Sequence, residues 1–139
     1  MRYLGVAENI AELASLVADG EGFNQMVGSF IDFNKHLVKT GREQEAAINF
    51  QAPPPLLDGV IEDGDVKDAF LAAMTEKLFQ DWKLGDPPRW IYVPSRFLDR
   101  PHFTIQTSNQ AFLEKLQRIS PEPFKKRNLF YTEKVLDRC

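Results

Sequence analysis

Apolar residues recur at helical spacing in four stretches of the chain. The longest pattern, over residues 22–41, has them at positions 23, 26, 27, 30, 31, 37 and 38. This i, i+3, i+4, i+7 repeat is typical of a helix that turns one face toward a core. The same repeat predicts helices over residues 7–20, 65–85 and 107–120. Glycines at positions 20, 41 and 85 indicate where the first three of these helices end.

Polar residues indicate where helical segments begin. Asp65 is a candidate N-cap, and Asp68 stands three residues later, in the place of a capping-box acid. Ser120 is a candidate cap for a further short helical turn over residues 120–128. Pro121 follows it, and proline suits the first position of a helix because the missing N–H would have no partner there.

Two regions interrupt the helical pattern. Three prolines at positions 53–55 cannot donate backbone hydrogen bonds and favour an extended connector. Residues 89–93 and 102–106 have the composition of short strands, and residues 129–139 fit either a short strand or a final helix after Thr132. The predicted fold is therefore mostly α: one compact helical domain over residues 1–139, with about five helices and at most one short β-hairpin.

Charge is divided unevenly along the chain. Residues 1–88 hold 7 lysines and arginines against 15 acidic residues, a balance of −8, and residues 89–139 hold 10 against 5, a balance of +5. We therefore distinguish an acidic helical region, residues 1–85, from a basic region rich in proline and aromatic residues, residues 86–139. Either the basic region presents a surface to a partner, or the two regions pair with each other in the fold.

Residues that commonly catalyse reactions or bind metals are sparse. His36 and His102 lie 66 positions apart, and the acidic run at residues 58–68 lacks the spacing of a calcium loop. The chain has no glycine-rich phosphate loop, and its single cysteine, Cys139, has no general base near it in the sequence. We therefore predict no catalytic residue, no metal and no cofactor. An enzyme of unknown type stays open as an alternative.

The sequence also bears on where the protein works. No stretch is long and apolar enough to predict a membrane span, and the N-terminus lacks the pattern of a signal peptide. A single cysteine allows no disulfide framework within the chain. We expect a cytoplasmic protein without membrane contact.

Residues 94–103, PSRFLDRPHF, gather charged, aromatic and proline residues in one short segment. Two arrangements of this segment are compatible with its composition. If Asp99 is buried and its carboxylate is satisfied, the segment is a folded connector. If Arg96, Arg100 and His102 instead project together into solvent, the segment is a binding edge.

The C-terminal region resembles the tail region of uncharacterised bacterial proteins that carry a tryptophan, an FLDEPWF-like segment and an SPxxFRRRNIFVxxxxLxR-like end. The matching residues are Trp90, Arg96, Phe97, Leu98, Asp99, Pro101, Phe103, Ser120, Pro121, Phe124, Arg127, Asn128, Leu129, Phe130, Leu136 and Arg138. Those proteins look like partners of nucleotidyltransferase-like proteins in toxin–antitoxin-type gene pairs. Those proteins often begin with a helix-turn-helix, which the first 85 residues here do not clearly show, so the resemblance implies only a protein-interaction role.

These observations favour a small cytoplasmic protein-interaction module, the antitoxin-like member of a bacterial gene pair, whose partner is another protein encoded by an adjacent gene. The predicted interaction surface consists of Arg96, Arg100, His102, Lys125, Lys126 and Arg127. The residues predicted to hold the C-terminal motif together are Trp90, Phe97, Asp99, Pro101, Phe103, Phe124 and Asn128. The alternative is a regulatory module that binds nucleic acid through the basic C-terminal third, with Lys125, Lys126 and Arg127 at the phosphates.

Overall fold

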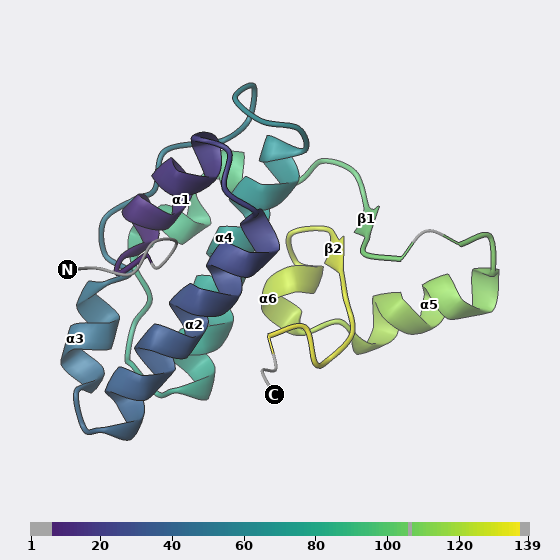
Figure 1. The fold of residues 1–139 in the computed structure, drawn as a ribbon. Coiled ribbons are helices and arrows are strands. Elements are labelled where there is room, and N and C mark those ends of the chain that lie inside the picture. Colours follow the sequence, from purple (N-terminus) through teal and green to yellow (C-terminus); the bar gives the residue numbers. More distant parts are fainter. Residues whose placement is uncertain (1–6, 106, 137–139) are drawn as a thin grey trace.

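The computed structural model describes residues 7–105 and 107–136 and is mostly α-helical (Figure 1). The α-helices of these residues are α1 (Ile10–Ala18), α2 (Phe23–Lys39), α3 (Glu43–Ile48), α4 (Gly64–Asp81), α5 (Gln110–Ile119) and α6 (Glu122–Lys125). The remaining elements are two 3₁₀ turns, η1 (Arg89–Tyr92) and η2 (Pro94–Arg96), and two short strands, β1 (His102–Phe103) and β2 (Leu129–Phe130). The predicted fold class is confirmed.

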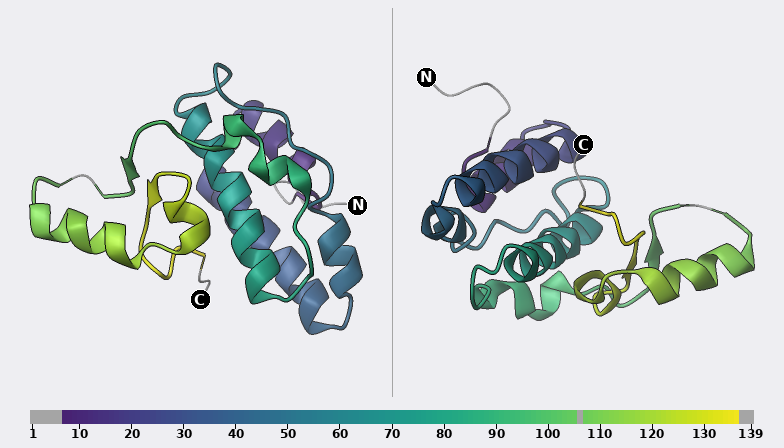
Figure 2. Two further views of the ribbon diagram at one scale, coloured as in Figure 1. Left: turned by 180° about the vertical axis from the view of Figure 1, so that it is seen from behind. Right: turned by 90° about the horizontal axis from the view of Figure 1, so that it is seen from below.

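Helix α4 is the centre of the fold. It lies between a layer formed by α1 and α2 and a second layer formed by η1, η2 and α6 (Figure 2). Its buried residues therefore surround the helix instead of forming one stripe. A helix that is covered on all sides needs small and apolar residues around its whole circumference, and the sequence AFLAAM at residues 69–74 supplies them.

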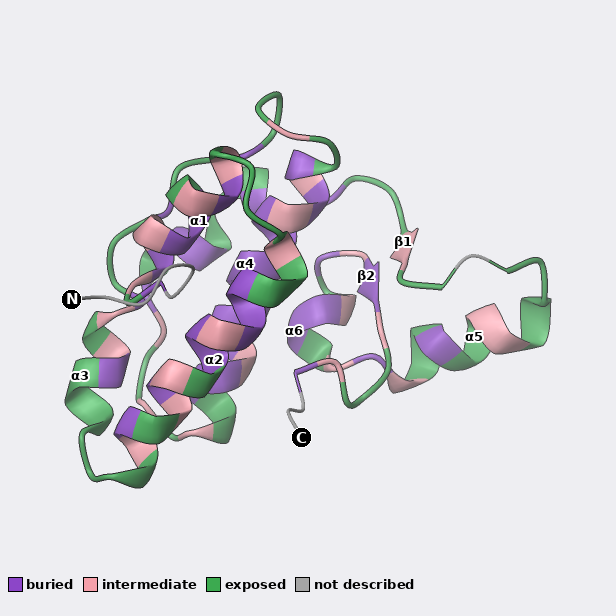
Figure 3. Cartoon of the chain, in the orientation of Figure 1, coloured by how far each residue is buried: buried purple, intermediate pink, exposed green. Residues whose placement is uncertain are grey.

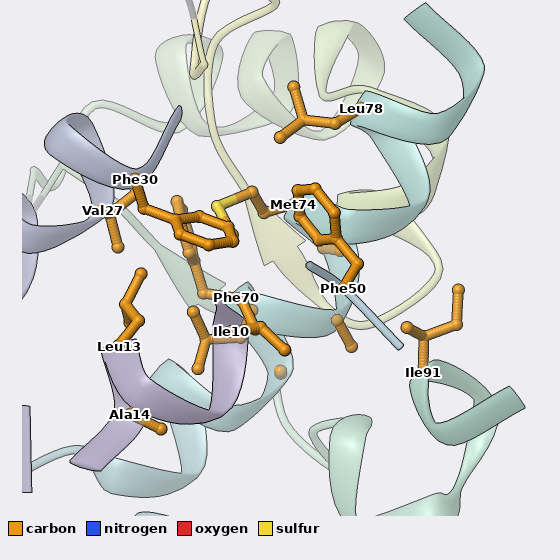
Figure 4. Packing of buried hydrophobic residues seen from close by; sticks show 14 of the residues in the cluster. Ile10, Leu13, Ala14, Val27, Phe30, Phe50, Phe70, Met74, Leu78 and Ile91 are labelled. Atoms are coloured by element: carbon orange, nitrogen blue, oxygen red, sulfur yellow. The ribbon is translucent and has the colours of Figure 1, made fainter. Parts of the chain in front are cut away.

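The hydrophobic core fills the space between α1, α2 and α4 (Figure 4). Phe50, in the connector after α3, packs edge-on against Phe30 of α2, with 5.1 Å between ring centroids, and against Phe79 of α4, at 5.5 Å. Edge-to-face aromatic pairs of this kind stabilise a core beyond the apolar area that they bury. The connector is thus fixed to the helices by its own side chain.

Two local features of the fold differ from the sequence analysis. Residues 43–48 form α3, although the sequence pattern breaks there; the helix has six residues and only Ala46 is buried, so it shows no apolar stripe. Residues 89–92, whose composition predicts a strand, form the 3₁₀ turn η1 instead, and β1 pairs with β2 in parallel, which agrees with the prediction of at most one hairpin. Its backbone bonds run from His102 N to Asn128 O, at 2.8 Å, and from Thr104 N to Phe130 O, at 3.1 Å.

The two predicted caps also act differently from the expectation. Helix α4 begins at Gly64, so Asp63 is its N-cap and Asp65 lies in the first turn. The buried carboxylate of Asp68 accepts hydrogen bonds from the backbone N–H groups of Leu57, at 2.7 Å, and Asp58, at 3.1 Å. Asp68 therefore fastens the preceding loop to α4. The buried hydroxyl of Ser120 lies 2.5 Å from Leu116 O and accepts from Tyr131 N at 3.0 Å, so it joins the end of α5 to the chain after β2.

The loop before α4 approaches the helix so closely that only glycine fits at its first residue. Gly64 is buried, and a Cβ atom built on it would overlap the backbone carbonyl of Leu57. Because the obstacle is backbone held by Asp68, it cannot move aside as a flexible side chain would.

We expect Gly64→Ala to destabilise the protein by about 3 kcal/mol, the upper range for overpacking a buried position. Chemical denaturation measures this loss. Gly22→Ala is the matched control, because a Cβ at Gly22 meets nothing within 4 Å. Equal stability of the Gly64→Ala and Gly22→Ala variants would contradict the close approach.

Candidate functional site

The basic residues predicted to form an interaction surface do not lie together on the surface. Arg96 is 2% exposed and Arg127 is fully buried. Arg100 and Lys126 are exposed, and His102 is partly buried. The prediction is therefore wrong for Arg96 and Arg127, because in this fold neither side chain can reach a partner.

Arg127 is the centre of a buried polar cluster. Its Nη1 donates to Glu76 Oε1 of α4 and to the carbonyl of Pro123, both at 2.7 Å, and its Nη2 donates to the carbonyl of Ile91 at 2.9 Å. The guanidinium also lies over the ring of Phe97, 4.6 Å from the centroid. One side chain thereby connects α4, η1, α6 and the segment that follows η2.

Arg96 performs a similar role nearer the start of α4. Its Nη2 donates to the carbonyl of Pro54 at 2.6 Å, and its Nη1 lies 3.7 Å from the buried carboxylate of Asp68. The guanidinium stacks over Trp90, 4.9 Å from the ring centroid. The indole N–H of Trp90 donates in turn to the carbonyl of Phe50, at 2.8 Å. The proline connector is therefore anchored by an arginine that comes 42 residues later in the chain.

These contacts bear directly on the uneven charge of the chain. Lys126 Nζ lies 2.7 Å from Glu76, which also binds Arg127, and Arg100 lies 2.9 Å from Asp65 at the start of α4. Together with Arg96 and Asp68, four cations of the basic region thus meet three acids of α4. Pairing within the fold accounts for these charges.

The run Lys125–Arg127 is correspondingly a poor phosphate-binding stripe. Arg127 is buried and Lys126 is paired with Glu76, while Lys125 Nζ donates to the carbonyl of Arg118 at 3.2 Å. To bind a nucleic-acid backbone, a protein needs several cations exposed on one surface, where each can approach a phosphate. The run meets that requirement only incompletely.

Most of the residues predicted to hold the C-terminal motif together are packed inside it. Trp90 and Phe124 are buried, Phe97 contacts Arg127, and Phe103 stacks on Phe130 at 5.1 Å between centroids. Asn128 adopts a left-handed conformation, with φ of 64°, and donates from Nδ2 to the carbonyl of Leu98 at 2.8 Å.

Asp99 and Pro101 differ from the rest of the motif. Both are exposed, and the Asp99 side chain is 94% exposed and lies 3.5 Å from Arg100. The expectation that Asp99 holds the motif together is therefore wrong. The segment 94–103 is neither a buried connector throughout nor a single binding edge, because it contains both the buried Arg96 and the exposed Asp99 and Arg100.

A pocket of about 520 Å³ opens beside His102. The start of α2, the first half of α4, β1 and the residue after β2 surround it. Its lining residues are Gly22, Phe23, Asn24, Gln25, Asp63, Val66, Lys67, Phe70, His102, Thr104 and Tyr131. Burial lowers the pKa of His102 below its ordinary value of 6.5, although Asp63 opposes the change, and burial raises the pKa of Tyr131 to about 12. Both side chains are therefore neutral at pH 7.

Helix α5 forms a second distinctive feature, which the sequence pattern only half predicted. The helix extends away from the body of the protein in every view (Figures 1 and 2). Its apolar residues Phe112, Leu113, Leu116 and Ile119 were expected to point inward, but only Leu116 is buried and the other three are half-buried (Figure 3). None of the four belongs to the main core or to the residues packed against it. We call α5 with this face the α5 arm.

The described residues also bear on metal binding and on membrane insertion. They contain no group of three or more His, Cys, Asp or Glu side chains that could hold a metal ion. No helix among them has the length and apolar character needed to cross a membrane. Cys139 and Arg138 lie outside the described residues.

No family model, curated protein or solved structure matches the chain.

We expect Arg127→Met to destabilise the protein by about 3–5 kcal/mol, because it leaves the Glu76 carboxylate buried with only Lys126 as a charged partner. Urea denaturation measures the free energy of unfolding. Lys125→Met removes a neighbouring, more exposed cation and should cost less than about 1 kcal/mol. A loss for Arg127→Met as small as that for Lys125→Met would show that Arg127 does not hold the fold together.

His102 should make stability depend on pH. Its pKa is lower in the folded chain than the 6.5 of an unfolded chain, so the unfolded chain binds more protons just below pH 6.5. The free energy of unfolding should therefore fall as the pH decreases through this window. Denaturation at about pH 7.5 and about pH 5.5 should show a smaller pH dependence in His102→Gln than in the unchanged protein. An unchanged dependence in His102→Gln, with His36→Gln as the control, would contradict this origin.

Proposed function

We propose that this chain is a small cytoplasmic protein-interaction module that binds a partner protein through the α5 arm. The observation that supports the proposal is the amphipathic helix that extends from the body and adds nothing to the main core. Phe112, Leu116 and Ile119 follow the i, i+4, i+7 spacing, and Leu113 lies beside them. An apolar helical face of this kind binds other proteins when it is inserted into a groove.

The charges of the α5 arm favour an acidic partner surface. Lys115 and Arg118 are both exposed on α5, and Lys125 is held against the carbonyl at the end of the same helix. Glu114 is the single acidic residue of α5. Complementary charge at the rim of an interface speeds association and orients the partner, while the apolar residues supply most of the affinity.

The resemblance of the C-terminal region gives the partner to test first. It implies an antitoxin-like member of a gene pair, so the candidate is the product of the adjacent gene. The α5 arm lies inside the resembling region but contributes none of its matching residues. A surface that recognises a particular partner is expected to vary in this way, whereas the buried residues of the motif maintain the fold.

The experiment compares two variants that introduce the same charge on opposite faces of α5. Leu113→Glu places a carboxylate on the apolar face, and Ala111→Glu places one on the opposite, exposed polar face. We expect Leu113→Glu to weaken binding of the purified adjacent gene product at least about tenfold, because a charge cannot be buried there without a partner. Ala111→Glu should change the Kd less than about threefold. Isothermal titration calorimetry measures both values.

The outcomes separate the proposal from simpler explanations. Denaturation of both variants checks the fold, which Leu113→Glu should leave largely intact because Leu113 lies outside the main core. No binding by the unchanged protein, or equal binding by the two variants, would overturn the proposal. Binding to nucleic acid that weakens steeply with salt would favour the alternative module.

A further inference from the structure

We propose that the pocket beside His102 is a binding site for an uncharged planar heterocycle that carries hydrogen-bonding groups. The inference is independent of the α5 arm, because no residue of α5 lines the pocket. Its volume of about 520 Å³ falls in the range of small-molecule sites, which is about 300–1,000 Å³. Three properties of its walls define the ligand.

The first property is the aromatic wall. Phe70 of α4 contacts Phe23 of α2 edge-on, with 5.6 Å between ring centroids, and contacts Tyr131 at 5.5 Å. All three residues line the pocket. Rings that meet at an angle offer both faces and edges to a guest, and a flat ring packs against them by offset stacking. This wall favours a planar ligand.

The second property is the balance of charge. Asp63 and Lys67 are the charged residues of opposite sign that line the pocket. The ammonium of Lys67 already donates to the carbonyl of Glu62 at 3.0 Å and lies 5.5 Å from the centre of the Phe23 ring. An anion or a cation would therefore meet both an attractive and a repulsive group. The pocket favours a ligand without net charge.

The third property is a pair of available hydrogen-bonding groups. The rings of His102 and Tyr131 lie 6.3 Å apart. Within the described residues of the chain, neither the imidazole nor the phenol hydroxyl has a hydrogen-bond partner. A neutral imidazole provides one donor and one acceptor, and a phenol hydroxyl provides both. A heterocycle with nitrogen or oxygen at its edge can satisfy these groups, which a hydrocarbon cannot do.

Nuclear magnetic resonance of the full chain tests the site directly. The chain has two histidines, so the ring signals of His102 and His36 are readily distinguished. His36 belongs to the last turn of α2, whereas the pocket lies at the first turn, so its signal is an internal control. Adenosine, uridine and indole are the probes, and inorganic phosphate is the charged comparison.

We expect at least one of the three heterocycles to shift the His102 signal in a saturable manner while the His36 signal stays in place. Tyr131→Phe should raise the Kd of that probe about two- to tenfold, the effect of one lost neutral hydrogen bond. Tyr92→Phe removes a hydroxyl from an exposed tyrosine outside the pocket and should leave the Kd unchanged.

Three results would overturn the proposal. The first is the absence of a saturable shift with every heterocycle up to its solubility limit. The second is a response to inorganic phosphate as strong as the response to the best heterocycle, which would indicate an anion site. The third is an equal Kd in the Tyr131→Phe and Tyr92→Phe variants, which would place the probe elsewhere on the protein.

Discussion

The burial of Arg127 against Glu76 is the interaction on which the rest of the structure depends. A charged pair inside a protein loses its hydration, so it persists only where further hydrogen bonds replace the lost water. Arg127 meets this requirement with the carbonyls of Pro123 and Ile91 and with the ring of Phe97. Its Nε still has no partner among the described residues, which adds a cost that the other contacts must offset. The result is a specific joint between α4 and the C-terminal region.

The contacts of Arg127 and of Arg96 together hold the C-terminal region and the proline connector against α4. Arg96 holds the proline connector against Asp68 and Trp90, and Asp68 holds the loop that begins α4. The aromatic residues of the C-terminal region provide flat surfaces for guanidinium groups, which arginine uses more effectively than lysine. The basic and acidic regions of the sequence are thus two halves of one packed structure. The features left for binding are the α5 arm and the pocket beside His102, and neither Arg96 nor Arg127 belongs to them.

The sequence predicts the long helices well because their apolar spacing is a local property. Helices α2 and α4 follow from it, and so does α5, although the spacing does not reveal that α5 extends from the body. The parallel pairing of β1 with β2 joins His102 to Leu129 and Phe103 to Phe130, far apart in the sequence, and no nearby residue signals it. Likewise, nothing adjacent distinguishes buried Arg127 from its exposed neighbour Lys126 in the run KKR. The sequence features that could have indicated buried arginines were the opposite net charges of the two regions and the abundance of aromatic residues near the arginines.

Native-state hydrogen exchange tests the central claim most directly, since it measures the opening free energy of each amide. If the buried arginines join the C-terminal region and α4 into a single cooperative unit, the amides of His102 and Thr104 should be protected nearly as well as those in the middle of α4. These two amides donate to β2 and its preceding residue. The amides of α5 should exchange much faster, because the helix is packed outside the main core. Rapid exchange at His102 and Thr104 with full protection in α4 would contradict the account, because the two regions would then open independently.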